Sequence, residues 1–347
     1  MTDPVWDTII VGQGLAGTTL AWHLIEAGQR VLIIDDGAPS SASRITPGLI
    51  TPITGRRLTP VDGHVEMHAA AEAFYTRIGG RLGRTLYRRH TAVRLFSTAA
   101  QAADWDQCKA DAAVRAHLVE PTPLLPDGLV DAPHGGFSMQ AAQVDAAGYL
   151  EASRARIPVV TAKVDWRADV VFDAGGVEVL GQRASRVIAC DGFAAMHSPH
   201  FGGLPFQNAK GEILTIRFPV AVPRVSLHRS LWLAPTADPH VFHAGSTSEW
   251  TTLDHAPTEA ARHEIEMKLR GFVCMPYEVV DHRAAVRPII RGRMPKLGLH
   301  PAEPRLGIFN GLATKGVIRA PWFARLLADH LVRGTALPTA CAIESEF

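Results

Sequence analysis

The chain contains only four cysteines among its 347 residues, and no two of them are close in sequence: Cys108, Cys190, Cys274 and Cys341. Without a C-x-x-C pair, neither a zinc site of the usual spacing nor a redox-active disulfide is expected. The 16 histidines also lack H-E-x-x-H or a comparable spacing. We therefore expect no metal site.

Charge and hydropathy exclude further classes of protein. The 35 Lys and Arg residues nearly balance the 34 Asp and Glu residues, so no overall field draws the chain to nucleic acid or to a membrane surface. No apolar run reaches the length of about 18 residues that a transmembrane helix needs. Because a signal-peptide pattern is also missing, a cytoplasmic location is expected. The length allows two domains or one large domain.

The N-terminal segment carries the strongest functional signal. Residues 8–11 form an apolar run, and the glycine pattern Gly12-Gln13-Gly14-Leu15-Ala16-Gly17 follows directly. A helical stretch over about residues 15–27 leads to a second apolar run at residues 30–34, which ends on Asp35. This order of strand, glycine turn, helix, strand and acid is typical of units that bind a dinucleotide.

Each feature of that pattern has a physical reason. Gly12 allows a tight turn, Gly14 lets a pyrophosphate approach the backbone, and Gly17 lets the helix pack against the strand. The N-terminus of the helix offers free N–H groups and partial positive charge to the phosphates. Asp35 lies about 20 residues further on, where the acid that binds a ribose hydroxyl is expected, with Asp36 as the neighbouring alternative. An acid at this place favours FAD or NAD over NADP.

No second phosphate-binding pattern follows. Residues 79–83 are rich in glycine but do not follow a strand. A disulfide reductase fed by NADPH needs a second nucleotide fold and a redox C-x-x-C, and the sequence shows neither. The substrate itself is then the expected hydride donor, which favours tightly held FAD over exchangeable NAD.

The remaining patterns alternate between α/β and β-rich material. Residues 142–155 are expected to form a helix, residues 161–166 a strand, and the last helix is expected to open with Pro321 in its first turn. We predict an α/β fold in which a Rossmann-like FAD-binding domain is assembled from discontinuous segments and carries an inserted antiparallel-sheet substrate domain. The expected segments are 1–80, 137–205 and 282–347 for the FAD-binding domain and 81–136 and 206–281 for the substrate domain.

Further motifs recur in a consistent order along the chain: Ser41-Ala42-Ser43 with Gly48-Leu49-Ile50, Phe137-Ser138-Met139 with Gln143-Val144-Asp145, Lys210-Gly211-Glu212, Ala244-Gly245-Ser246-Thr247, Ala285-Val286-Arg287-Pro288, and Gly311 to Gly316 before Ala320-Pro321. From residue 8 to about residue 333, this series resembles the D-amino-acid-oxidase-like FAD oxidoreductases. That family includes glycine oxidase, sarcosine oxidase and the FAD domain of the tRNA wobble-uridine modifying enzyme. The resemblance implies an enzyme that oxidises a C–N bond of a small amine or amino acid by hydride transfer to flavin N5.

The resemblance also implies which residues hold FAD. Val164 would lie at the adenine side, and the loop before the last helix would bring N–H groups and positive potential to the flavin pyrimidine, with Lys315 adding a charge. Because no cysteine lies near this loop, noncovalent FAD is expected. The implied cofactor residues are Gly12, Gln13, Gly14, Leu15, Ala16, Gly17, Asp35, Asp36, Ser43, Arg44, Gly48, Leu49, Ile50, Val164, Ala189, Cys190, Gly192, Gly311, Leu312, Ala313, Thr314, Lys315, Gly316 and Val317.

Four residues are candidates at the substrate end. In the resembling family, the arginine at the position of Arg287 holds a substrate carboxylate, which suits a planar guanidinium. The alternative for Arg287 is a salt bridge with an acid at a domain interface. Trp232 would form a wall of the pocket, His228 would make a polar contact or a structural hydrogen bond, and Lys210 would lie near the flavin or only begin a strand. The expected partner is a small amine that carries a carboxylate. The sequence does not indicate the oligomeric state.

Three other functions stay open. Residues 187–192 resemble the D-G element of single-component flavin monooxygenases, because Asp191 is present. That class also carries a G-D pair before its last helix, where this chain has Gly311-Leu312-Ala313-Thr314-Lys315. A 2-hydroxy-acid dehydrogenase would use the same carboxylate anchor, and a flavin-binding partner subunit would bind FAD without turnover.

Overall fold

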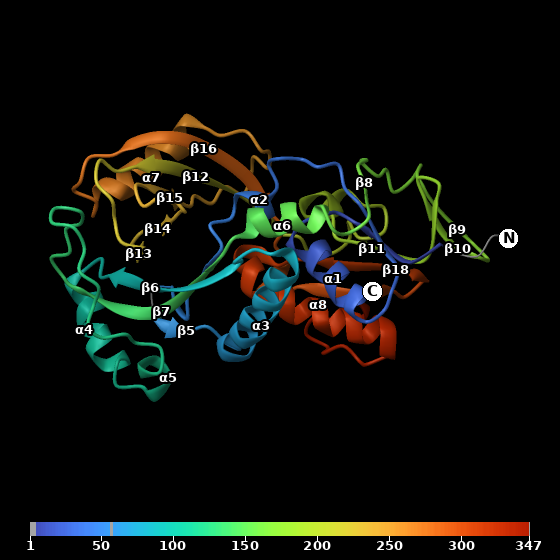
Figure 1. The fold of residues 1–347 in the computed structure, drawn as a ribbon, viewed down its shortest axis with the longest axis horizontal. Coiled ribbons are helices and arrows are strands. Elements are labelled where there is room, and N and C mark those ends of the chain that lie inside the picture. The colour runs from blue at the N-terminus through green and yellow to red at the C-terminus, as the bar shows by residue number, and fades with distance from the viewer. Residues whose placement is uncertain (1–4, 56–57, 347) are drawn as a thin grey trace.

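Two eight-stranded sheets organise the molecule (Figure 1), whose computed structural model describes residues 5–55 and 58–346. In the first sheet the main path runs β17-β18-β11-β1-β2-β8, and all neighbours except β17 and β18 pair in parallel. The hairpin β9-β10 extends the sheet from β11. The strands are β1 (Trp6–Val11), β2 (Val31–Ile34), β8 (Val159–Val160), β9 (Val170–Asp173), β10 (Gly176–Val179), β11 (Gln182–Ala189), β17 (Lys296–His300) and β18 (Glu303–Asn310).

Both faces of the first sheet are buried, which explains its continuous apolar runs. Ile10 and Ile33 pack into one core, together with the helices at that face, while Ile9 and Leu32 belong to a second core on the opposite face. This is the alternation expected for a strand, in which neighbouring side chains point to opposite sides. The helices of the first core are α1 (Leu15–Glu26), α3 (His64–Leu82), α6 (Ala146–Arg154) and α8 (Gly316–Arg333), which lie together in Figure 1.

The second sheet is mainly antiparallel and runs β16-β12-β15-β14-β13-β6-β7-β3, with only β13 and β6 paired in parallel. Its strands are β3 (Leu49–Ile50), β6 (Tyr87–Leu95), β7 (Gly136–Val144), β12 (Ala209–Arg217), β13 (Val225–His228), β14 (Trp232–Pro235), β15 (Val241–Gly245) and β16 (Glu278–Arg287). A separate hairpin pairs β4 (Ile53–Thr54) with β5 (Thr59–Pro60).

Helices α7 (Glu259–Arg270), α4 (Ala99–Cys108) and α5 (Ala112–Arg115) pack against the second sheet. Helix α7 buries Ile265 and Leu269 in a core shared with β12 to β15. Helices α4 and α5 cover β6 and β7 through Trp105 and Val114. The remaining helical turns are α2 (Ala42–Ile45), η1 (Gly192–His197), η2 (Arg291–Arg293), η3 (Ala313–Lys315) and η4 (Ile343–Glu346).

The expected mixed α/β class is confirmed, but three element boundaries were wrong. The helix expected from residue 142 begins only at Ala146, because β7 continues to Val144 and Asp145 caps the helix by accepting from the Gly148 amide. Residues 161–166 form no strand, since β8 ends at Val160. The last helix begins at Gly316, so Pro321 lies inside it rather than in its first turn.

The proposed division into domain segments stays a prediction, to which the strand pairing adds one observation. Strand β7 pairs with β6 over residues 136–144, and strand β16 pairs with β12 over residues 278–287, both within the second sheet. Both strands then lead the chain back toward the first sheet, β7 into α6 and β16 toward β17. The chain therefore crosses from the second sheet to the first at the C-terminal ends of β7 and β16.

Candidate active site

A cleft of about 1410 Å³ lies between the two sheets. One wall is formed by the carboxyl ends of β1, β2, β11 and β18, and the other by one face of the second sheet. Open parallel sheets bind ligands at this end of their strands. The volume exceeds the 300–1,000 Å³ that is typical for a drug-sized ligand, so the cleft has room for a dinucleotide and a small substrate.

The glycine turn shows two different uses of a missing side chain. A Cβ on Gly17 would lie 2.0 Å from the carbonyl oxygen of Gly12, and a Cβ on Gly12, where φ is +105°, would lie 2.4 Å from that of Cys190. These glycines allow close packing of the chain. A Cβ on Gly14 would meet only the Ser43 hydroxyl, at 3.0 Å. The space beside Gly14 otherwise opens to the cleft, as a pyrophosphate requires.

The acid after β2 is held by several donors. Asp35 accepts hydrogen bonds from the Gln13 amide at 2.7 Å and from the Gly37 amide at 2.9 Å. Arg154 on α6 reaches the Asp35 carboxylate at 3.3 Å and the Gln13 side-chain oxygen at 2.5 Å. Asp36 lines the cleft but is exposed. Sequence reasoning missed Arg154, since only the packing of α6 beside β2 brings it to this place.

The loop before α8 is fixed by Asn310, a buried residue that sequence reasoning also missed. Its side-chain nitrogen donates to the Gly192 carbonyl at 2.8 Å, and its oxygen accepts from the Gly311 amide at 2.7 Å. The Ala313 amide donates to the Pro288 carbonyl at 3.1 Å. The first turn of α8 then lines the cleft, so the positive end of the helix dipole faces it. An Asn before a Gly at a strand end was the available sequence signal.

Asp191 has an incomplete set of hydrogen bonds. The Trp166 indole donates to its Oδ2 at 3.0 Å. Its Oδ1 is shielded from water and has no partner among the described residues. Burial raises the pKa of Asp191 to about 6, although the bond from Trp166 acts in the opposite direction. Because Asp191 lines the cleft, a hydroxyl of a bound dinucleotide would satisfy this oxygen. Together with the space at Gly14, this residue fits the expected FAD.

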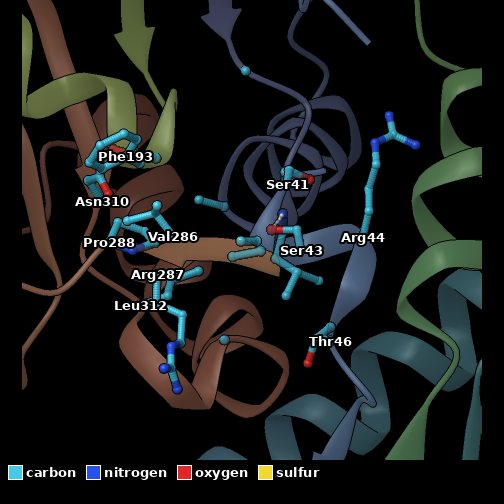
Figure 2. Close-up of a pocket in the computed structure, with 18 of the residues that line it drawn as sticks. Ser41, Ser43, Arg44, Thr46, Phe193, Val286, Arg287, Pro288, Asn310 and Leu312 are labelled. Atoms are coloured by element: carbon cyan, nitrogen blue, oxygen red, sulfur yellow. Dashed lines mark hydrogen bonds between the residues drawn. The ribbon is translucent and has the colours of Figure 1, made fainter. Parts of the chain in front are cut away.

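On the opposite wall, Arg287 has its guanidinium in the cleft without a carboxylate partner among the described residues. It donates to the carbonyls of Thr247 at 2.7 Å and Lys210 at 3.2 Å. Gly211 leaves room for this side chain, because a Cβ there would lie 2.5 Å from a guanidinium nitrogen. Burial lowers the pKa of Arg287. Figure 2 shows opposing groups in the pocket, Arg287, Pro288 and Asn310 on one side and Ser41 and Ser43 on the other.

Trp232 and His228 lie beside each other on the same wall, as paired residues of β14 and β13. A Cβ on Gly245 would lie 3.1 Å from the Trp232 ring, so this glycine gives the ring its place. His228 hydrogen-bonds the Ser226 hydroxyl at 3.1 Å. Burial lowers the pKa of His228 to about 3. Its imidazole is therefore neutral at pH 7, which leaves it as a polar contact.

Lys210 does not line the cleft. Its side chain leaves the strand on the face opposite to that of Gly211, because neighbouring residues of a strand alternate. There its ammonium group lies 2.6 Å from Asp254 and 3.5 Å from Glu212. The contacts of Lys210 are thus those of a buried structural ion pair. Of the two basic candidates on β12 and β16, only Arg287 lines the cleft.

The remaining predicted cofactor residues divide into two groups. Gly17, Gly48 and Ala189 do not line the cleft but shape its wall. A Cβ on Gly48, where φ is +72°, would lie 1.9 Å from the Val144 carbonyl oxygen. The cleft is lined by Gly12, Gln13, Gly14, Leu15, Ala16, Asp35, Asp36, Ser43, Arg44, Leu49, Ile50, Val164, Cys190, Gly192, Gly311, Leu312, Ala313, Thr314, Lys315, Gly316 and Val317.

Neither a membrane-spanning helix nor a metal-binding cluster is found in the part of the chain that the structure describes. Across residues 5–55 and 58–346, no helix is both long enough and apolar enough to cross a membrane. In the same part of the chain, no three His, Cys, Asp or Glu side chains gather as a metal site would require.

Comparison with known proteins supports the same fold. A family model described as FAD dependent oxidoreductase matches residues 7–330. Glycine oxidase from Pseudomonas aeruginosa is 28% identical over 129 residues, which span 36% of this chain and only 35% of that relative. The structure of glycine oxidase from Geobacillus kaustophilus has a TM-score of 0.74 at 20% identity, covering 96% of this chain and 95% of its own. Iminodiacetate oxidase from Chelativorans sp. BNC1 has a TM-score of 0.73 at 22% identity, covering 95% and 97%.

Proposed function

The chain belongs to the family of FAD dependent oxidoreductases, and from this premise we propose that it oxidises the C–N bond of a small amine or amino acid that carries a carboxylate. The observation that carries the proposal is Arg287. A guanidinium that lines a cleft of this size without an ion-pair partner among the described residues is suited to a carboxylate ligand. The names of the similar enzymes, glycine oxidase and iminodiacetate oxidase, agree with a substrate of this class.

FAD, when bound, supplies a hydride acceptor, and the protein supplies binding and orientation. Gly14 and the first turn of α1 would receive the pyrophosphate, while Asp35 would accept from a ribose hydroxyl. The free amides at the start of α8 would stabilise negative charge that develops on the flavin pyrimidine. The cofactor residues named above remain proposals, each tied to its position on the cleft wall.

At the substrate end, orientation is the main task. Arg287 would hold the carboxylate with its charge and its Nη1 donors, because both hydrogens of Nη2 are already donated to the Thr247 and Lys210 carbonyls. This contact would fix the direction of the neighbouring C–H bond. Its own guanidinium is held by the Thr247 and Lys210 carbonyls, so little freedom is lost when the substrate binds. Trp232 would exclude water from the reacting carbon with its ring. The neutral His228 offers a hydrogen bond and adds no charge at pH 7.

The Arg287→Lys variant tests this assignment. Lysine keeps the charge but loses the planar guanidinium that the Thr247 and Lys210 carbonyls hold in place, so KM for an amino acid should rise about tenfold or more. A matched amine without the carboxylate is the control, since its KM should change little between the two proteins. An unchanged KM for the amino acid would remove Arg287 from the substrate site.

A second candidate function is favoured by one observation, the position of Asp191 in the cleft. A flavin monooxygenase would place an acid there and would draw its electrons from NADPH. Rapid loss of the visible flavin absorbance on anaerobic addition of NADPH would support this function and exclude the amine oxidase. A 2-hydroxy-acid dehydrogenase would instead respond to hydroxy acids in the same assay.

A further inference from the structure

A second arginine lines the cleft wall formed by the second sheet, and the proposed function does not use it. Arg94 lies on β6, and its Nη2 makes one long hydrogen bond, of 3.4 Å, to the Gly55 carbonyl. Its Nε is shielded from water and has no partner among the described residues. An arginine has five N–H donors, and no carboxylate of the described residues pairs with those of Arg94. Partial burial lowers the pKa of the Arg94 guanidinium.

The surroundings of Arg94 do not neutralise it. The two nearby histidines are neutral at pH 7, because burial lowers the pKa of His228 to about 3 and of His90 to about 4. No Asp or Glu of the described residues lines the cleft on the face of the second sheet. The acids that line it belong to the dinucleotide end: Asp35, Asp36, Asp165 and Asp191. The substrate end of the cleft therefore carries two arginines without a carboxylate beside them.

The strand register places Arg94 on the same face as the other substrate residues. His228 pairs with Arg94 on one side and with Trp232 on the other, and Trp232 pairs with Gly245. Directly paired residues point to the same face of a sheet. Trp232 and His228 thus lie between Arg94 and the region of Gly211, over which the guanidinium of Arg287 lies.

The separation of the two arginines sets the length of the ligand. Four steps between neighbouring strands lead from β6 through β13, β14 and β15 to β12. At about 4.8 Å a step, the backbone of Arg94 lies about 19 Å from that of Ile213, its counterpart on β12, which is two residues along the strand from Gly211. The two long side chains shorten the gap between their charged ends. A ligand that reaches both must still extend past the Trp232 ring by several bonds.

We propose that the substrate carries a second anionic group, at the end remote from its α-carboxylate, and that Arg94 binds this group. The proposal rests on the proposed function for the identity of the first anchor, Arg287. Substrates of this class are amino acids whose side chain or N-substituent ends in a carboxylate. Arg94 then determines specificity, because a neutral tail would leave its charge buried without a partner.

Binding of straight-chain α,ω-dicarboxylates to the FAD-loaded protein tests the proposal without turnover. Dicarboxylates of increasing length are compared with monocarboxylates of equal length by titration calorimetry. The longer dicarboxylates should bind roughly tenfold or more tightly than their monocarboxylate partners, as expected for hydrogen bonds to a charged group. Arg94→Met should abolish this preference, and Arg94→Lys should keep part of it. The matched control is Arg88→Met, which removes an exposed arginine from the same strand and should keep the whole preference.

The outcomes separate the two proposals. Equal affinity for dicarboxylates and monocarboxylates in the wild type would overturn the inference, as would a preference that survives Arg94→Met. A preference that depends on Arg94, in a protein that oxidises none of the matching amino acids, would uphold the second anion site and contradict the amine oxidase. Oxidation of neutral-tailed and anionic-tailed amino acids at the same kcat/KM would uphold the amine oxidase and contradict the second anion site. Thermal unfolding of each variant shows whether a loss of binding reflects a loss of fold.

Discussion

Replacing Asp191 by Asn should stabilise the protein without FAD, and the gain should depend on pH. Burial raises the pKa of this carboxyl from its ordinary value of 3.8 to about 6. The folded state therefore disfavours the charged form. Below pH 3.8 the carboxyl is protonated in both the folded and the unfolded chain, and no penalty exists. The penalty grows as pH rises from 3.8 and is complete above about 6.

The size of the effect follows from the same pKa values. Each pH unit between the two values corresponds to 1.36 kcal/mol, so the full penalty at pH 8 is about 3 kcal/mol. At pH 4.5 only about 1 kcal/mol of it has developed. Asparagine does not titrate in this range and still accepts the hydrogen bond from the Trp166 indole. Asp191→Asn should therefore raise the free energy of unfolding by about 2 kcal/mol more at pH 8 than at pH 4.5.

Urea unfolding of the FAD-free protein at the two pH values measures this difference. Asp104→Asn is the control, since Asp104 is an exposed residue of α4, and its replacement should change stability little at either pH. Bound FAD should reduce the pH dependence if one of its hydroxyls donates to the free carboxyl oxygen. An equal effect of Asp191→Asn at both pH values would refute the argument, because the carboxylate would then be solvated or paired in the folded chain.

Further predictions concern the dinucleotide end of the cleft. Gly14→Ala should weaken FAD binding but leave the thermal stability of the FAD-free protein nearly unchanged, because the added Cβ meets only the Ser43 hydroxyl; lowered stability without FAD would contradict this. Gly17→Ala should destabilise the fold itself by several kcal/mol, since its Cβ would lie 2.0 Å from a carbonyl oxygen, and a normal melting temperature would show that α1 can move. Arg154→Met should weaken FAD binding by several-fold, measured by flavin fluorescence, because Asp35 and Gln13 lose a shared donor. Unchanged affinity would mean that the remaining amide donors suffice to hold Asp35.

The dinucleotide end of the site is the part for which local sequence pattern carries most information. The path from β1 through Gly12, Gly14 and Gly17 to Asp35 depends on neighbours in sequence, and Gly12, Gly14 and Asp35 line the cleft, while their role in binding FAD stays a proposal. The start of α8 was harder, because Gly316 is a weak helix former and Pro321 looks like a first-turn residue. Only the packing of the helix in the core with α1 overrides these local preferences.

The substrate end depends on strand register, which a single sequence does not reveal. Lys210 and Gly211 are neighbours, yet only Gly211 lines the cleft, so an error of one residue exchanges the cleft wall with the opposite face of the sheet. Arg94 lies 134 positions before His228 in the chain but pairs with it across β6 and β13. No periodicity within β6 indicates this partner. Arg154 likewise gains its place only through the packing of α6.

The most direct test of the central claim is anaerobic mixing of the purified FAD-loaded protein with a panel of amino acids, N-methyl amino acids and 2-hydroxy acids. The account predicts that at least one amine with an α-carboxylate bleaches the visible flavin absorbance, and that its carbonyl product appears in equal amount. The result that would contradict the account is that no amine bleaches the flavin, while a hydroxy acid, or NADPH added in a separate anaerobic trial, does.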